Sequence, residues 1–248
     1  MLCALGHHVK RRSPDSTDPW ADDAPRGAPL GYPLYPMTER RRQRIFDVLS
    51  RRQPDLTVLA DDVYKPHNLS AILRSCDAVG IGEVHAVKPT GGVATYNATS
   101  ASAEKWVDLV VHDSIGTAVG TLKERGYKVY AAHFSEEAVD YRDVDYVQPC
   151  AVLLGNEKDG VTDEAAALAD RHIIIPMLGM VQSLNVSVAA AVILFEAQRQ
   201  RREAGMYATP RLTPLQTREV ALRWLSRSDA VLLAQEPLPG EDQSASQL

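Results

Sequence analysis

The sequence has few cysteines, and the three that it has are far apart. Cys3, Cys76 and Cys150 form no CxxC pair, and their number is odd. A disulfide framework uses paired cysteines and a structural zinc site uses closely spaced ones, so neither is indicated. A reducing cytoplasm is therefore the expected location, and no metal is expected.

Long apolar runs are also missing. The longest, VAAAVILF, spans residues 188–195, whereas a helix needs about 20 apolar residues to cross a bilayer. The N-terminus has no uninterrupted apolar stretch of the kind that signal peptides carry. No membrane partner is expected.

Several common active-site motifs do not occur. No GxGxxG follows the first expected strand and there is no GxxxxGK[ST], which argues against an ordinary Rossmann dinucleotide site and against a P-loop. HExxH and GxSxG are missing as well, so the protease and hydrolase classes lose their usual support.

Positive charge is scarce overall but concentrated in one segment. The chain has a net charge of -5, yet residues 37–52 hold six arginines against two acids, a net charge of +4. Arg40, Arg44 and Arg51 are spaced by four and seven residues and are predicted to share one helix face. A solvated face and a surface that binds RNA phosphates both explain this pattern, and both interpretations stay open here.

The composition divides the chain into three parts. Residues 1–36 are rich in proline, lack apolar periodicity and are predicted to be a disordered tail; translation from Met37 is a hypothesis that mass spectrometry of the N-terminus would test. Residues 37–207 hold the basic helix and the main domain. Residues 208–248 are predicted to form a helical extension capped by Thr213, followed by a disordered acidic tail.

Strand and helix patterns alternate within the main domain. Strands are expected over residues 56–63, 83–89, 106–112, 128–134, 150–156 and 172–177. Helices are expected over residues 38–49, 68–80, 114–126, 162–170 and 180–202, with Asn68 as one of the N-caps. This alternation predicts an α/β fold with a mostly parallel sheet, helices on both faces, and N- and C-terminal helical extensions.

Three loops at the expected strand ends carry the polar residues. KPHNLSAILRS (65–75) is explained equally well by a binding loop and by a helix cap followed by a solvent-exposed arginine. LLGNEKDGV (153–161) is explained equally well by a binding loop and by a polar turn before a helix. A glycine at a strand's carboxyl end also allows a ligand to approach the backbone. IPMLGMVQSLNVS (175–187) is long for a connection and has more small polar groups than one cap needs, which favours binding. Such loops suit an enzyme that transfers a group by positioning the two reactants, more than one that uses covalent catalysis.

These loops resemble the motifs of the SpoU/TrmH family of RNA ribose 2′-O-methyltransferases, in the SPOUT superfamily. The three family motifs are carried by HNLSAILRSCDAVG, LLGNEKDGV and IPMLGMVQSLNVSVAAAVILFEAQRQR. The resemblance runs from about Met37 to Tyr207. Within the family, the sequence is most similar to the members that methylate the D-loop guanosine 18 of tRNA. The alternatives are methylation of ribosomal RNA or of the tRNA wobble nucleotide, and a non-catalytic RNA-binding protein.

The resemblance implies a trefoil-knotted SPOUT fold, a homodimer, a tRNA substrate and the cofactor S-adenosylmethionine. It implies that the cofactor is held by Ala132, Gly155, Ile175 and Leu184. It implies a catalytic set of Asn68, Arg74, Glu157, Ser183 and Asn185, in which Arg74 is either the general base or the group that binds phosphate and stabilises the alkoxide. For RNA binding, Arg40, Arg44 and Arg51 are expected to act with the basic helix end at Arg199, Arg201 and Arg202.

Overall fold

The computed structural model describes residues 38–63, 65–88, 105–156, 158–225, 229–230 and 233–234. The tail predicted at residues 1–36, the acidic segment at 236–248 and the candidate Glu157 all lie outside the described residues.

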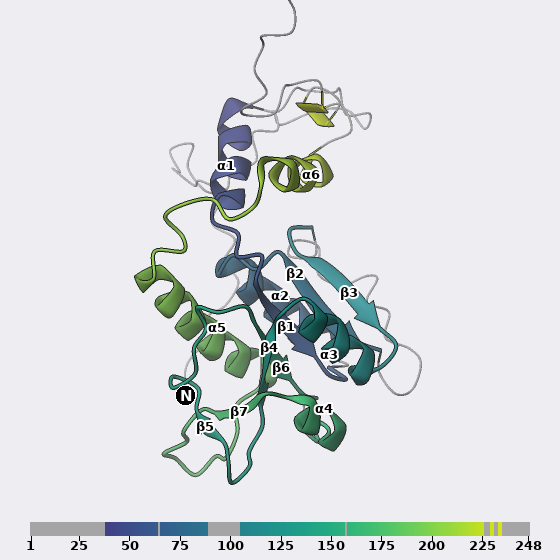
Figure 1. Cartoon of the computed structure of the whole chain (residues 1–248), viewed down its shortest axis with the longest axis vertical. Coiled ribbons are helices and arrows are strands. Elements are labelled where there is room, and N and C mark those ends of the chain that lie inside the picture. Colours follow the sequence, from purple (N-terminus) through teal and green to yellow (C-terminus); the bar gives the residue numbers. More distant parts are fainter. Residues whose placement is uncertain are drawn as a thin grey trace, which may run out of the picture. The chain divides into compact units, whose positions relative to one another are not determined.

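Seven strands form one sheet in which every described strand pair is parallel (Figure 1). In chain order they are β1 (Leu56–Ala60), β2 (Glu83–Val87), β3 (Asp108–His112), β4 (Lys128–Ala132), β5 (Val139–Asp140), β6 (Cys150–Leu154) and β7 (Arg171–Ile174). Their order in space is β3-β2-β1-β6-β4-β7-β5. The prediction of a parallel sheet is confirmed, although the two-residue β5 was missed because it is too short to show a period.

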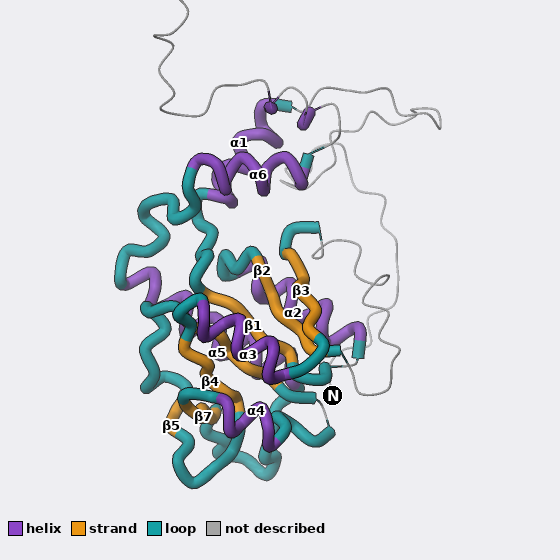
Figure 2. Tube along the Cα trace, turned by 45° about the vertical axis from the view of Figure 1, so that its right-hand side comes forward, coloured by secondary structure: helices purple, strands orange, loops and turns teal. Residues whose placement is uncertain are grey.

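Two pairs of helices cover the two faces of the sheet (Figure 2). They are α2 (Pro66–Ala78) with α5 (Val186–Glu203), and α3 (Ile115–Glu124) with α4 (Asp163–Leu168). Val58 and Val152 pack toward α2 and α5, whereas Leu59 and Leu153 pack toward α3 and α4. Neighbouring side chains of a strand point to opposite faces, so strands covered on both sides are apolar throughout.

Most helices begin where the sequence predicts. Thr38, Thr162 and Thr213 each accept a hydrogen bond from the backbone of the first helical turn, and Thr213 also forms a capping box with Gln216. These caps depend only on residues three positions apart, which explains why they could be predicted.

Helix α2 contradicts its predicted start. It begins at Pro66 with Lys65 as the N-cap, so Asn68 lies inside the first turn and is buried. Proline at the first helical position needs no hydrogen-bond partner for its nitrogen, and this favours the earlier start. The end of α2 was predicted correctly, because Gly80 follows it with a φ of +90°.

Two further boundaries differ from the prediction. Helix α5 begins at Val186, so residues 180–185 form a loop that leads to its N-cap, Asn185. Helix α1 (Glu39–Leu49) ends before Arg51, which therefore does not lie on a helix face with Arg40 and Arg44.

A third, smaller core joins the two helical extensions. Ile45 and Leu49 of α1 pack with Ala221 and Trp224 of α6 (Pro214–Trp224). The predicted extensions therefore pack together as one unit, which is called the α1–α6 unit below.

Candidate functional site

Three neighbouring strands end at the residues predicted to hold the cofactor. In the sheet, Ala131 of β4 is in register with Leu153 of β6, and Ala132 is in register with Ile173 of β7. Because the strands are parallel, Ala132, Gly155 and Ile175 follow at the same edge of the sheet. Ligands of open α/β sheets bind at this carboxyl edge. The structure therefore brings these three predicted residues together.

The loop after β6 folds back onto Gly155. A Cβ atom at Gly155 would lie 2.0 Å from the carbonyl carbon of Gly160, which has a φ of +75°. Asn156 forms an isolated bridge with Gly160, and its Oδ1 accepts from the backbone N–H groups of Lys158 and Asp159 at 2.8 and 2.6 Å. Position 155 requires glycine because the loop's own backbone approaches it. The approach of a ligand to this backbone is a second reason and not the only one.

Asp61 ties the end of β1 to this loop, a role that the sequence did not reveal. Its carboxylate is buried and accepts from the hydroxyl of Thr162 at 2.8 Å and from its N–H at 3.3 Å. The Asp61 N–H donates to the carbonyl of Leu154 at 2.8 Å. The cap of α4 is therefore held to the strand ends by one carboxylate.

The first and third motifs meet at a pair of asparagines. The Nδ2 of Asn185 donates to Oδ1 of Asn68 at 3.2 Å, and Asn68 is only 2 % exposed. The Oδ1 of Asn185 accepts from the N–H of Ser187 at 2.8 Å and from its hydroxyl at 2.6 Å. Asn185 thus caps α5 and also contacts α2. A direct hydrogen bond therefore joins the first and third motifs, a contact that the sequence did not reveal.

Two other predicted catalytic residues, Arg74 and Ser183, lie on α2 and in the loop before α5. Arg74 is on the exposed side of α2, whose buried side packs against α5. Ser183 is exposed and Leu184 half-buried in the loop that leads to α5.

Two histidines beside this edge were not predicted. His133 follows Ala132 and packs edge-on against His172, with ring centroids 5.1 Å apart. The Nε2–H of His172 donates to the carbonyl of Ala166 at 3.0 Å, and its Nδ1 forms a hydrogen bond with the hydroxyl of Ser135 at 2.8 Å. Burial lowers the pKa of His133, and His172 lowers it further. Both effects favour the neutral form of His133, and the sequence could not show them because the partner comes from another strand.

The predicted RNA-binding arginines have different surroundings. Arg40, Arg44, Arg51 and Arg202 are exposed. Arg199 forms ion pairs with Glu196 at 2.8 Å and with Glu203 at 2.7 Å.

Arg201 contradicts its predicted role. Its exposed fraction is 0 %, and its guanidinium binds Asp55 at 2.6 Å inside the protein. A side chain so enclosed cannot contact RNA, because its charge is already surrounded by protein groups.

A cavity lies at the opposite edge of the sheet. It has a volume of about 220 Å³ and lies beside the first residues of β1, β2 and β3 and the helix α6. Trp106, Tyr127 and Trp224 contribute aromatic rings to its wall. Of the predicted catalytic and cofactor residues that the structure describes, none lines it.

Among the residues that the structure describes, no three His, Cys, Asp or Glu side chains gather as a metal site would require. Within the same residues, no helix combines the length and the apolar character needed to span a bilayer.

Comparisons with known proteins agree in both sequence and fold. Residues 55–195, more than half of the 248 residues, match the model of the SpoU rRNA Methylase family. The chain is 64% identical over 190 residues to a tRNA (guanosine(18)-2′-O)-methyltransferase of Thermus thermophilus, which covers 77% of this chain and 98% of that one.

Two solved structures are similar as well. The TrmH/SpoU tRNA modifying enzyme of Aquifex aeolicus has a TM-score of 0.69 and 41% identity, covering 75% of this chain and 95% of the other. The SpoU methyltransferase AviRb of Streptomyces viridochromogenes, solved in complex with the cofactor AdoMet, has a TM-score of 0.54 and 30% identity, covering 63% and 61%.

Proposed function

This chain belongs to the SpoU rRNA Methylase family, and we propose that it methylates the ribose 2′-hydroxyl of guanosine 18 in the D-loop of tRNA. The observation that carries this proposal is the hydrogen bond between Asn68 and Asn185, which joins two family motifs on the side of the sheet where α2 and α5 pack. The choice of tRNA and of guanosine 18 is supported by the activity named for the Thermus thermophilus relative.

S-adenosylmethionine is the proposed cofactor, and it supplies the methyl group when bound. The proposed site fits a ligand held mainly by backbone groups, because Ala132, Gly155 and Ile175 follow neighbouring parallel strands. Leu184, half-buried in the loop before α5, adds an apolar side chain. The AdoMet complex of the similar AviRb enzyme supports this choice.

Arg74 is the residue proposed to act on the ribose. A guanidinium keeps its charge in proteins and donates up to five hydrogen bonds. We therefore assign Arg74 to binding an RNA phosphate and stabilising the negative charge that develops on the 2′-oxygen, rather than to proton abstraction. Asn68 and Asn185 would orient the loop, and Ser183 would contact the ligand from it. Glu157 is proposed as a member of the catalytic set on the basis of the resemblance alone.

The RNA is proposed to bind across the α1–α6 unit. Arg40 and Arg44 are exposed on α1, and Arg51 is exposed just beyond it. Exposed arginines on one short segment provide the phosphate contacts that give most of the affinity for RNA. Arg202 is exposed at the end of α5 and would extend this surface, whereas Arg201 is not part of it.

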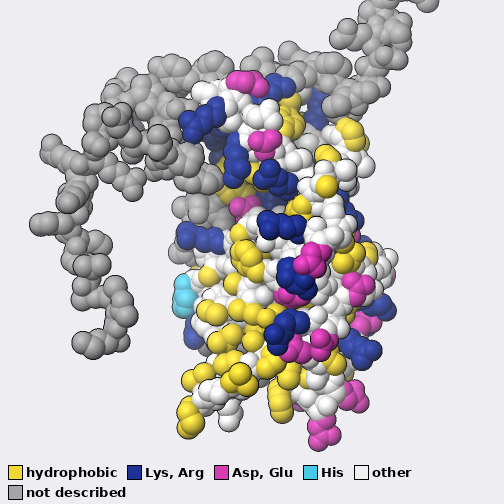
Figure 3. All heavy atoms as spheres, turned by 90° about the vertical axis from the view of Figure 1, so that its left-hand side faces the viewer, with side chains coloured by type: hydrophobic (Ala, Val, Ile, Leu, Met, Phe, Trp, Pro, Cys, Tyr) yellow, Lys and Arg dark blue, Asp and Glu magenta, His cyan; other side chains and the backbone are white. Residues whose placement is uncertain are grey.

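A homodimer is proposed from the apolar side chains that remain exposed. Figure 3 shows hydrophobic side chains gathered over one part of the face on which α5 lies, apart from a region richer in lysine and arginine. The exposed apolar residues of α5 and of the loops at the carboxyl edge are Phe134, Leu178, Met180, Val181, Val188 and Phe195. Large exposed apolar patches mark interaction sites. A second copy would cover them and place its surface next to the proposed site.

A trefoil knot and a cytoplasmic location complete the proposal. Both rest on the family resemblance, and tRNA processing supports the location. Knots are rare in proteins, so the strand order alone would not suggest one.

Methyl transfer from labelled S-adenosylmethionine tests the proposed activity. The purified protein is incubated with transcripts of tRNA and of ribosomal RNA, and the modified nucleotide is then mapped. Label at guanosine 18 is the expected result. Label at the wobble nucleotide or in ribosomal RNA would replace the substrate assignment, and binding without transfer would show a non-catalytic RNA-binding protein.

A further inference from the structure

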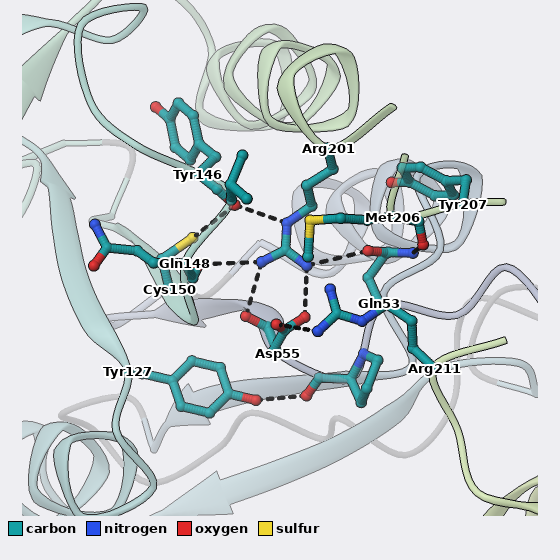
Figure 4. A network of polar contacts seen from close by, with 12 residues as sticks. Gln53, Asp55, Tyr127, Tyr146, Gln148, Cys150, Arg201, Met206, Tyr207 and Arg211 are labelled. Carbon is teal, nitrogen blue, oxygen red and sulfur yellow. Dashed lines mark hydrogen bonds and ion pairs between the residues drawn. The ribbon is translucent and has the colours of Figure 1, made fainter. Parts of the chain in front are cut away.

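Two connections join the α1–α6 unit to the sheet, and both pass through one polar cluster (Figure 4). Residues 50–55 lead from α1 to β1, and residues 204–213 lead from α5 to α6. Asp55 lies at the end of the first connection, and Arg211 lies in the second. How these two connections are held is therefore one determinant of the orientation of the unit.

Arg201 holds the sheet side of the cluster. Its Nε donates to the carbonyl of Tyr146 at 2.8 Å, and its Nη1 donates to Gln53 at 3.2 Å and to Asp55 Oδ1 at 2.6 Å. Its Nη2 donates to the carbonyls of Asp55 at 3.0 Å and Gln148 at 3.2 Å. A guanidinium has five N–H groups, and all of them are used. The cluster is therefore fixed at this end without help from Arg211.

Arg211 attaches the second connection to the same carboxylate. Its Nη2 donates to Asp55 Oδ2 at 2.7 Å, while Oδ1 is taken by Arg201. Next to it, the side chain of Gln53 donates to the carbonyl of Met206 at 3.1 Å. One carboxylate thus links β1, α5 and the segment that leads to α6.

Stability alone would not require the charges of Asp55, Arg201 and Arg211. Two guanidinium groups share one carboxylate whose side chain is only 18% exposed, and Arg201 is fully enclosed. Well-packed apolar side chains often stabilise a protein as much as such a buried ionic group does. Unlike apolar side chains, the ionic group fixes one relative arrangement of the segments that it joins, because its hydrogen bonds are satisfied in only that arrangement.

We propose that Asp55 and Arg211 are positioning residues for the RNA substrate. They hold the α1–α6 unit, with its exposed Arg40 and Arg44, in one orientation relative to the carboxyl edge of the sheet. Asp55 precedes the first residue of β1, whereas the proposed cofactor site follows the last residues of the strands, so Asp55 acts through the unit and not on the ribose. This inference rests on the proposed function.

The Arg211→Ala variant of the full chain tests the proposal. The Kd and KM for tRNA are expected to rise about tenfold, equivalent to about 1.4 kcal/mol of binding free energy, while kcat and the Kd for S-adenosylmethionine stay within about twofold. The slope of log Kd against log salt concentration should not change, because Arg211 would not itself contact a phosphate. Arg40→Glu with Arg44→Glu should lower that slope.

Two variants serve as controls. Arg211→Lys keeps the single donor that Arg211 uses and is expected to bring the Kd for tRNA back to within about threefold of wild type. Arg223→Ala removes another arginine that reaches from α6 to the sheet, but its ion pair with Asp108 at 2.8 Å is about half exposed. An exposed pair contributes little, so this variant should bind tRNA like wild type.

Four results would overturn the proposal. The first three are wild-type tRNA binding by Arg211→Ala, an equal defect in Arg223→Ala, and a reduced salt slope in Arg211→Ala, which would make Arg211 a direct RNA contact. A loss of thermal stability with equal weakening of both ligands would also overturn it, since that shows a general folding role. If the wild-type protein modifies no tRNA, the proposed function fails instead, which separates the two.

Discussion

The side-chain amide of Asn185 donates a hydrogen bond to the side-chain oxygen of Asn68, and the two residues are 117 positions apart in the chain. The same Asn185 caps α5 through the backbone of Ser187. One side chain therefore combines a local role with a long-range one, and the two can be separated by substitution.

Asn185→Ala removes the cap and the link to Asn68 together. The free energy of unfolding is expected to fall by about 1–3 kcal/mol, from the lost cap and one hydrogen bond, as measured by urea denaturation. Asn185→Ser keeps an oxygen that can cap α5 and should recover about 1 kcal/mol. Its methyl transfer should nevertheless remain impaired about tenfold or more. Full activity of Asn185→Ser would show that only the cap matters.

Arg74→Ala is expected to reduce methyl transfer by about 100- to 1000-fold, the usual loss when a charge-stabilising group is removed. Arg74→Lys should lose most of the activity too, because an ammonium group cannot form the paired hydrogen bonds of a guanidinium. Single-turnover assays with saturating tRNA measure this effect. Lys123→Ala, on the opposite face of the sheet, is the matched control and should be fully active. Substantial turnover by Arg74→Lys would contradict a guanidinium-specific role.

Gly155→Ala should disrupt the loop after β6. The added methyl group would lie 2.0 Å from the backbone of Gly160, so the loop must open, at a cost of about 1–3 kcal/mol. Binding of S-adenosylmethionine, measured by calorimetry, should weaken in parallel. Gly120→Ala is the control, since nothing lies within 4 Å of the new atom in α3. That variant is expected to gain about 0.5–1 kcal/mol. A Gly155→Ala protein that binds the cofactor normally would show that the loop adapts.

Stability should fall as the pH is lowered, in two separate ranges. Hydrogen bonds from His85 and Arg125 lower the pKa of Glu83 to about 2 from an ordinary 4.5. Burial and the neighbouring His85, 2.8 Å away, lower the pKa of His112 from an ordinary 6.5. Both folded-state pKa values lie below the unfolded ones. The contribution of His112 is therefore complete above pH 6.5 and is lost below it, and that of Glu83 is lost between pH 4.5 and about 2.

Urea denaturation at a series of pH values checks this prediction. His112→Asn should flatten the dependence just below pH 6.5, and Glu83→Gln should flatten it only below pH 4.5. Stability that rises on acidification from pH 7 would contradict the assignment, because the sign of both shifts forbids it.

Phe195→Asp is expected to separate the proposed dimer. Phe195 is 50% exposed on α5, and a carboxylate in an apolar interface would be buried without a partner. Sedimentation velocity should show a monomer at micromolar concentration. Leu215→Asp on α6 replaces another apolar side chain of similar exposure, 55%, and it should leave the sedimentation coefficient unchanged. A wild-type protein that sediments as a monomer would remove the basis for this prediction.

Local features could be predicted from the sequence because they depend on residues close together in the chain. The helix starts at Thr38, Thr162 and Thr213 and the glycines after two helices, Gly80 and Gly126, lie where the expected helix ranges begin and end. The alternation of helices with apolar strands likewise predicted a parallel sheet. The candidate site came from the motifs, and the sheet places three of its members at one edge.

Long-range contacts decided what the sequence could not. Arg201 looks like any arginine at the end of a helix, and only the fold surrounds it with Gln53 and Asp55, about 150 positions earlier. Asparagine is a common N-cap residue, yet the packing of α2 on α5 makes Asn68 a buried partner of Asn185. The sequence by itself determined where most of the helices and strands form, since neighbours along the chain set those preferences. Only the tertiary structure decided which polar side chains face solvent and which are buried, because burial depends on segments that meet in space.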